Sequence, residues 1–290
     1  MKVLVFGTVC LDRLRTVGSI PEPGGYVEII DEELFLGGEA ANTACALHEW
    51  GVSIALMPNP IGTDEAGIAL LRLAEKRGIQ LVVRSGVATP FCDIYVTPDS
   101  ERTMFGFGFT SLAPTVRIEF PKDAAGWFTA EPNFGATARE AAVQANARGC
   151  QLYLMDFNEP DDPIPPGSWW QSSTDWVGKR GDARLNAQFA SEQARRFQCH
   201  AALTDGAFGV YYAPPSGEAV HIPALPSNGL VDATGAGDRF RAGMLYGLTQ
   251  EWRIEDCLRY ASAAGARKLA AKGGSAPVDS PEAIRAWAGL

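Results

Sequence analysis

Short hydrophobic runs alternate with helical patterns along most of this 290-residue chain. Buried strands are predicted over residues 2–6, 52–57, 152–156 and 200–204. Helical patterns cover residues 39–50, 67–77, 136–148, 184–197, 236–249 and 254–271. Such alternation favours an α/β fold with a mostly parallel sheet. The length, with 46% hydrophobic residues, suffices for a sizeable core in one large domain or in one domain with an appendage.

Two segments interrupt the alternation. Residues 26–36 and 91–109 have the pattern of extended, partly exposed strands, and a turn is predicted at Pro98-Asp99-Ser100. Each segment lies between α/β elements, so we expect strands inserted from two places to form a small sheet over one edge of the main layer. The Pro-rich stretch 159–170 is predicted to be a connection within the fold.

Composition excludes several classes of protein. The net charge is -9, whereas sequence-independent nucleic-acid binding needs a basic surface, so no nucleic-acid partner is expected. Six cysteines with no CxxC pair, and three histidines, indicate neither a zinc site nor a disulfide framework. The apolar run at the N-terminus is too short for a signal peptide, and no stretch approaches the ~18 apolar residues of a membrane span. The sequence therefore predicts a cytoplasmic protein without membrane partners.

The stretch VDATGAGDRF, residues 231–240, is the strongest candidate for chemistry. Apolar residues at Phe240, Met244 and Leu248 predict a helix that begins near Ala236. Glycines before a helix N-terminus let backbone N–H groups approach a phosphate. Asp238 in the first turn has two interpretations. It is either an acid favoured by the helix dipole or a base that takes a hydroxyl proton.

Two further stretches could bind a polyol. Gly37 and Gly38 precede a helix lined by small residues, and Asn42 within it offers both a donor and an acceptor. Asp12 follows the first predicted strand, and ligands of open α/β sheets bind at the carboxyl ends of strands. Taken alone, each stretch is more typical of a structural role, such as a glycine turn or close helix packing, than of a binding role.

Two common nucleotide motifs do not account for the glycines. In a dinucleotide-binding fingerprint the third small residue would stand where Phe240 does, and too few residues follow for the second half of that fold. The Walker pattern GxxxxGK[ST] is absent from the sequence.

Together these stretches, in this order, resemble the ribokinase-like, or PfkB-type, carbohydrate kinases, and the resemblance covers nearly the whole chain. It implies a single domain over residues 1–290: a three-layer αβα fold with a mostly parallel central sheet and a small β lid from inserted segments at about 13–36 and 91–110. The implied activity is transfer of the γ-phosphoryl group of ATP to a hydroxyl of a small sugar or polyol.

The resemblance also assigns roles to residues. Asp238 would be the catalytic base, and the N–H groups of Gly235, Ala236 and Gly237 would form the anion hole. The acceptor would be bound by Asp12, Gly37, Gly38 and Asn42. The nucleotide loop would lie at residues 204–209 and use Thr204, Gly206 and Gly209.

Cofactors implied by the resemblance are ATP and Mg²⁺, and K⁺ is a further candidate. Family members usually carry an Asn-x-x-Glu that organises magnesium, but residues 176–182 hold neither Asn nor Glu in place, so the metal ligands stay unassigned. Lys179 or Arg180 could supply charge there instead. Some members bind a monovalent cation near Asp232 and a glycine loop, which residues 273–275 resemble weakly.

The acceptor remains open at this point. Glu39 stands where ribokinases tend to have Lys, which argues against an anionic acceptor. Alternation of Phe105, Phe107 and Phe109 fits packing within the lid, and also stacking on a nucleoside base. A nucleoside kinase, and a ligand-binding homologue without activity, are therefore alternatives. Arg239, after Asp238, could assist the phosphoryl chemistry or face solvent. A homodimer through the lid is expected by analogy with family members.

Overall fold

The computed structural model describes residues 2–98, 102–227 and 229–290. Its main sheet has eight strands in the order β12-β11-β10-β9-β8-β7-β1-β4. Six adjacent strands are parallel: β4, β1, β7, β8, β9 and β10. At the other edge, β11 is antiparallel to β10, and β12 is antiparallel to β11. Their bounds are β1 Val3–Gly7, β4 Ile54–Pro58, β7 Trp127–Ala130, β8 Gln151–Met155, β9 Trp169–Ser173, β10 His200–Thr204, β11 Val210–Ala213 and β12 Val220–Ile222.

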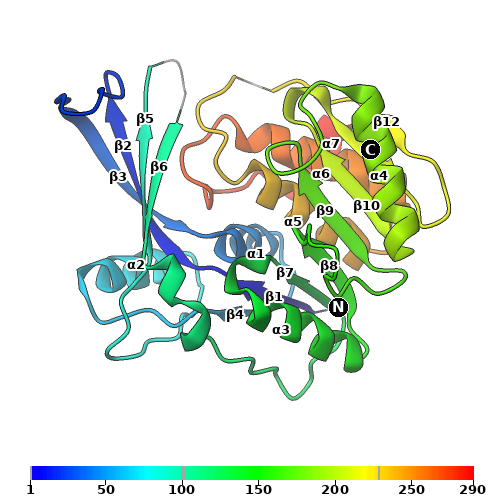
Figure 1. Ribbon diagram of the computed structural model, residues 1–290, viewed down its shortest axis with the longest axis horizontal. Helices are drawn as coiled ribbons and strands as arrows, with labels where there is room; N and C mark the ends of the chain where they lie inside the picture. Colours follow the sequence, from blue (N-terminus) through cyan, green and yellow to red (C-terminus); the bar gives the residue numbers. More distant parts are fainter. Residues whose placement is uncertain (1, 99–101, 228) are drawn as a thin grey trace.

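Helices cover both faces of this sheet (Figure 1). One face packs against α1 Glu39–Glu49, α5 Ala236–Thr249, α6 Ile254–Lys268 and α7 Pro281–Ala288. The opposite face packs against α3 Ala136–Ala147 and α4 Ala183–Phe197. Alternate residues of one strand enter the two cores, as Val3 and Val5 do on one side and Leu4 and Phe6 on the other. The predicted three-layer αβα class is confirmed.

A second sheet of four strands, in the order β3-β2-β5-β6, stands beside one end of the main sheet (Figure 1). It comprises β2 Cys10–Val17, β3 Ile29–Gly37, β5 Phe91–Val96 and β6 Arg102–Phe107, and we call it the lid. Its base packs on α2 Glu65–Lys76 through Leu11, Leu36 and Leu70. The predicted turn at Pro98-Asp99-Ser100 extends beyond the described residues.

Most predicted elements are found, but the structure differs from the prediction in several places. The helix predicted over 254–271 ends at Lys268, where the chain turns into a glycine loop. Strands β7, β9, β11 and β12 and helix α7 were not predicted, and β9 begins within the Pro-rich stretch assigned to a connection. Asp12 does not lie at the end of the first strand, because β1 stops at Gly7 and Asp12 belongs to β2 of the lid.

All six cysteines are free thiols, five of them buried and Cys92 half-buried. Within the described parts of the chain, no helix combines the length and the apolar character needed to cross a bilayer.

Candidate active site

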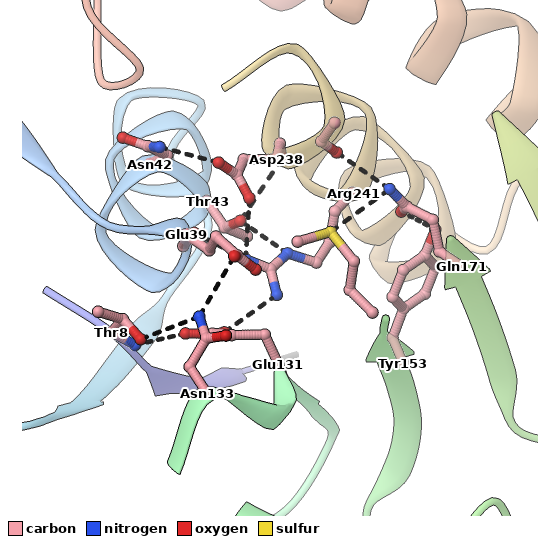
Figure 2. Close-up of polar contacts among 12 residues, drawn as sticks. Thr8, Glu39, Asn42, Thr43, Glu131, Asn133, Tyr153, Gln171, Asp238 and Arg241 are labelled. Carbon is pink, nitrogen blue, oxygen red and sulfur yellow. Dashed lines mark hydrogen bonds and ion pairs between the residues drawn. The ribbon is translucent and has the colours of Figure 1, made fainter. Parts of the chain in front are cut away.

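Polar side chains gather where the carboxyl ends of the parallel strands meet the N-termini of α1 and α5 (Figure 2). Glu131 follows β7 and Asp156 follows β8, while Asp238 comes from the first turn of α5. Asn42 and Thr43 come from α1. Ligands of open α/β sheets bind at this edge, so the fold places these residues at the expected position for a site.

Asp238 is buried, with 5% of its surface exposed. One carboxylate oxygen accepts a hydrogen bond from Asn42 Nδ2 at 2.8 Å, and the other lies 3.3 Å from Arg241 Nη2. Burial raises the pKa of Asp238, against the opposing effects of Arg241 and of the Asn42 hydrogen bond. A carboxylate held in this way is suited to accept a proton near neutral pH.

The backbone before α5 presents unpaired donors. Gly235 has φ +77°, and a Cβ there would stand 2.7 Å from the Cα atom of Gly274, so both the turn and the packing require glycine. Ala236 N–H donates to the carbonyl of Ala233 at 3.3 Å. The N–H groups of Gly235 and Gly237 find no acceptor among the described residues. Space above Gly237 is open, so an anion could be bound there.

Gln171 of β9 links the main sheet to this helix N-terminus. Its amide nitrogen donates to the carbonyl of Gly237 at 3.1 Å, and its amide oxygen accepts from the Tyr153 hydroxyl at 2.7 Å (Figure 2). Since Tyr153 is fully buried in the core, the donors of the α5 N-terminus are fixed to a rigid part of the fold.

A buried arginine, which the sequence did not single out, organises the cluster. Arg241 has no exposed surface and lies between Asp238 and Glu131, with Nη1 3.4 Å from a Glu131 oxygen. Its Nε donates to the Thr43 hydroxyl at 2.8 Å and its Nη2 to the Glu39 carbonyl at 2.7 Å. The other Glu131 oxygen accepts from the backbone N–H of Thr8.

The negative charge of this cluster exceeds its positive charge. Burial, then repulsion from Glu131 and Asp238, raises the pKa of Glu39 well above its ordinary value. Asn133 donates to one Glu39 oxygen at 3.2 Å, and the other oxygen is buried without a partner among the described residues. The carbonyl oxygen of Asn42 is likewise buried and unpaired within the described chain. Both oxygens can therefore accept a hydrogen bond from a bound ligand.

Asp12 faces the same region from the lid. Its carboxylate lies against Gly37, so closely that a Cβ at Gly37 would overlap it. Burial, with smaller effects from the charges of Asp232 and Asp238, raises the pKa of Asp12 to about 7, against the opposing effect of the hydrogen bond from the Cys10 thiol. Of the predicted residues, Asp12 is thus in contact with Gly37 and its charge interacts with that of Asp238, to which Asn42 is hydrogen-bonded. Gly38 caps α1 with its backbone against Thr8.

Asp205, which lies between the predicted nucleotide-binding residues Thr204 and Gly206, anchors the predicted nucleotide loop. Asp205 is fully buried and accepts hydrogen bonds from Thr174 Oγ1 (2.8 Å), Gly181 N (3.0 Å) and Asn186 Nδ2 (3.0 Å). The Thr204 hydroxyl donates to the carbonyl of Ser172 at 3.2 Å. Asp205 thus joins the loop at 204–209 to Thr174, Gly181 and Asn186, which flank or lie within residues 176–182, the region that holds neither Asn nor Glu.

The two glycines of this loop have different surroundings. Gly209, at φ +98°, is packed against the backbone of residues 222–224. Gly206, at φ +53°, has the Arg180 guanidinium 4.0 Å from its Cβ position. Of the two basic residues considered for charge in this region, Arg180 is therefore the one beside the loop, where it also pairs with Asp175 at 3.5 Å.

A smaller polar group follows β8. Asp156 has φ +60°, an unusual conformation for a residue other than glycine that is often found at functional sites. Burial raises the pKa of Asp156 to about 6, although the Ser172 hydroxyl donates to it at 2.6 Å. Asn158 Nδ2 donates to the same hydroxyl at 3.2 Å, and its carbonyl oxygen is buried without a partner in the described chain.

Three residues noted in the sequence face away from the site. Arg239 is 4% exposed and donates to the carbonyl of Ala276 at 2.8 Å, so it neither faces solvent nor points at the α5 donors.

Phe105 pairs in register with Asp93, and Cys92 with Asp12, so Phe105 and Asp12 lie on opposite faces of the lid. Phe107 shares the face of Phe105 and stacks on Phe91, which favours packing within the lid.

Sequence and structure comparisons find relatives that match nearly the whole chain. A relative from Dictyostelium discoideum, described as an uncharacterized sugar kinase, is 29% identical over 94% of this chain and 93% of its own length. A candidate ribokinase from Agrobacterium tumefaciens has the same fold, with a TM-score of 0.84 and 22% identity over 100% of this chain and 99% of its own. A nucleoside kinase from Burkholderia thailandensis, solved in complex with inosine, gives a TM-score of 0.75 and 20% identity over 99% and 96% of the two chains.

The family model for pfkB family carbohydrate kinases matches residues 1–124 and 174–281, which include every predicted site residue. The matched ranges cover well over half of the chain. The protein therefore belongs to the PfkB family of carbohydrate kinases.

Proposed function

We propose that this protein transfers the γ-phosphoryl group of ATP to a hydroxyl of a small sugar or related polyol, with Asp238 as the base. One observation carries the proposal. A buried carboxylate of raised pKa stands in the first turn of a helix at whose N-terminus the N–H groups of Gly235 and Gly237 have no acceptor among the described residues. Base and anion site are thus adjacent, as phosphoryl transfer to a hydroxyl requires.

Asp238 would accept the proton of the attacking hydroxyl while the N–H groups of Gly235 and Gly237 stabilise charge on the phosphoryl group. Asn42 and Arg241 hold the carboxylate in place, so little reorganisation is needed at the moment of transfer. Ala236 N–H, already bonded to Ala233, would contribute less than its neighbours.

The acceptor site suits a molecule rich in hydroxyl groups. Asp12, the free Glu39 oxygen and the Asn42 carbonyl oxygen all accept hydrogen bonds, and hydroxyls donate them. Arg241, the cation nearest these groups, already pairs with two carboxylates. An acceptor with a phosphate or carboxylate group would meet uncompensated negative charge, so a neutral acceptor is favoured. A nucleoside remains the second candidate, because the Burkholderia enzyme of this fold binds one.

Mg²⁺ would arrive on the phosphates of ATP, since it commonly keeps several waters and takes one or two protein carboxylates. No group of three or more His, Cys, Asp or Glu side chains forms a metal site in the described chain. Asp156 and the unpaired Asn158 carbonyl oxygen fit such a partial role, because both offer hard oxygen ligands and the charge of Asp156 reaches Asp238. When bound, the ion would neutralise charge on the phosphates.

A monovalent cation does not fit beside Asp232. The oxygens that could bind it, from Asp232 and Ala271, are already in contact with the ammonium group of Lys268.

ADP release should be measured with ATP and Mg²⁺ against free sugars, sugar acids, sugar phosphates and nucleosides. We expect turnover with one class of neutral acceptor, and mass spectrometry should find one added phosphoryl group on it. Folded protein that binds ATP but releases no ADP with any acceptor would instead support the ligand-binding alternative.

Replacing Gly37 with Ala should weaken binding of the acceptor and leave ATP binding unchanged. The new methyl group would overlap the Asp12 carboxylate and move it out of the site. We expect the KM for the acceptor to rise about tenfold, the scale of one lost charge-assisted hydrogen bond, with the KM for ATP within twofold. Gly18→Ala is the matched control, since a Cβ there meets nothing within 4 Å. Equal changes in both KM values would contradict the assignment.

The lid is proposed to pair with the lid of a second copy. Its face opposite Asp12 exposes Leu34, Phe105 and Phe107, with 60% of Phe105 accessible, and exposed apolar groups of this kind favour association. Light scattering should give twice the chain mass at micromolar concentration, and Phe105→Asp should halve it. A monomeric wild-type protein would exclude this interface.

A further inference from the structure

Outside the catalytic cluster, a buried ammonium group lies beside Asp232, in the stretch that leads into α5. Lys268, the last residue of α6, is 2% exposed. Its Nζ lies 3.0 Å from the Asp232 carbonyl oxygen and 2.8 Å from the Ala271 carbonyl oxygen. An oxygen of the Asp232 carboxylate is 3.8 Å away. Backbone carbonyls around a charge of +1 are also how proteins bind K⁺.

Asp232 connects this lysine to the anion-binding donors. One of its carboxylate oxygens accepts from Thr234 N and the other from Gly273 N, each at 2.8 Å. The carboxylate thereby joins the stretch leading into α5 to the glycine loop, which touches Gly235 through Gly274. A cation held on Asp232 fixes the two loops that shape the anion site.

The charge of Lys268 also reaches the proposed base. Burial lowers the pKa of Lys268 to about 8, while Asp232 opposes the decrease, so the amine remains mostly protonated at pH 7. Its positive charge is among those that lower the pKa of Asp238 and favour the ionised base.

We propose that the Lys268 ammonium is a covalently attached substitute for a monovalent cation, so that this kinase positions its α5 loop without K⁺. Lys268 is a positioning residue: it acts through Asp232 and the loop, not on the reacting atoms. The inference rests on the proposed function for its activity readout, but its binding readout does not.

The proposal is tested first on the wild-type protein. Initial rates in potassium, sodium and ammonium chloride should stay within twofold of the rate in tetramethylammonium chloride of equal ionic strength, because that ion is too large for the site. The melting temperature should be equally insensitive. Activation by K⁺ of more than fivefold, or a saturable rise of the melting temperature with K⁺, would overturn the proposal.

Lys268→Ala should make the activity depend on a monovalent cation in solution. In tetramethylammonium its kcat should fall by about tenfold or more, the scale of a slightly misplaced catalytic group. Potassium or ammonium should restore it saturably to within about threefold of wild type and raise the melting temperature of the variant. Lys272→Ala, which removes a half-exposed lysine of the neighbouring loop, should show neither effect. A folded Lys268→Ala protein that is fully active without K⁺, or that K⁺ neither reactivates nor stabilises, contradicts the proposal.

The outcomes separate the two proposals. If no acceptor is phosphorylated, the melting temperatures of wild type and variant in the different salts still decide the role of Lys268. If Lys268→Ala does not fold in any of these salts, the salt response of the wild-type protein decides it.

Discussion

Asp238→Asn should lower kcat by about 10²-fold or more, because the amide cannot accept the proton of the attacking hydroxyl. The change keeps the size of a side chain that is 5% exposed, so the fold should persist. KM for ATP should change little, since the N–H donors of Gly235 and Gly237 belong to the backbone. The measurement is steady-state ADP release, accompanied by thermal unfolding of both proteins.

The competing interpretation of Asp238 is an acid favoured only by the dipole of α5. On that view its removal would cost at most about 1 kcal/mol of unfolding free energy and leave turnover intact. Glu65→Gln is the matched control, because Glu65 is an exposed acid in the first turn of α2. Both variants lose a first-turn charge, but only Asp238→Asn should lose activity. An Asp238→Asn enzyme with more than a third of the wild-type kcat would refute the role of base.

The residues that could be predicted from sequence lie in short local motifs. Gly235 and Asp238 are three positions apart. The next ten residues show the apolar periodicity of the helix that begins there. Gly37 and Asn42 are likewise separated by five positions. The predicted start of α5 at Ala236 agrees with the structure because glycine turns and helical periodicity are properties of the local chain.

The residues that could not be predicted depend on contacts across the fold. Arg241 and Glu131 are 110 positions apart, and in the sequence Arg241 resembles one of the many charged residues that face solvent. Glu131 follows β7, a four-residue strand too short to show periodicity. Lys268 and Asp232 meet only because α6 ends beside the loop before α5. The prediction for Asp12 was wrong about its element, since the chain leaves β1 at Gly7 and continues extended into the lid.

Arg241→Met is expected to be the most destabilising of the substitutions considered, because it leaves Asp238 and Glu131 buried without their shared counter-charge. Breaking a buried ion pair in this way typically costs 3–5 kcal/mol, roughly what we expect here for the free energy of unfolding. Arg195→Met is the control, since Arg195 forms an exposed pair with Glu218 and should cost about 1 kcal/mol or less. Urea denaturation measures both.

The pH dependence of the same variant separates stability from catalysis. The guanidinium of Arg241 lowers the pKa of Asp238, so its removal should raise that pKa and move the acid limb of the kcat/KM profile to higher pH. Arg241→Lys keeps the charge and should bring the limb back toward its wild-type position, even if its stability is only partly recovered. The other groups that lower the pKa of Asp238, the Asn42 hydrogen bond and the charges of Arg239 and Lys268, are unchanged in both variants, as are the acidic neighbours Glu39 and Glu131. Arg241→Met with a folded core and an unshifted acid limb would mean that Arg241 stabilises the fold without setting the protonation of the base.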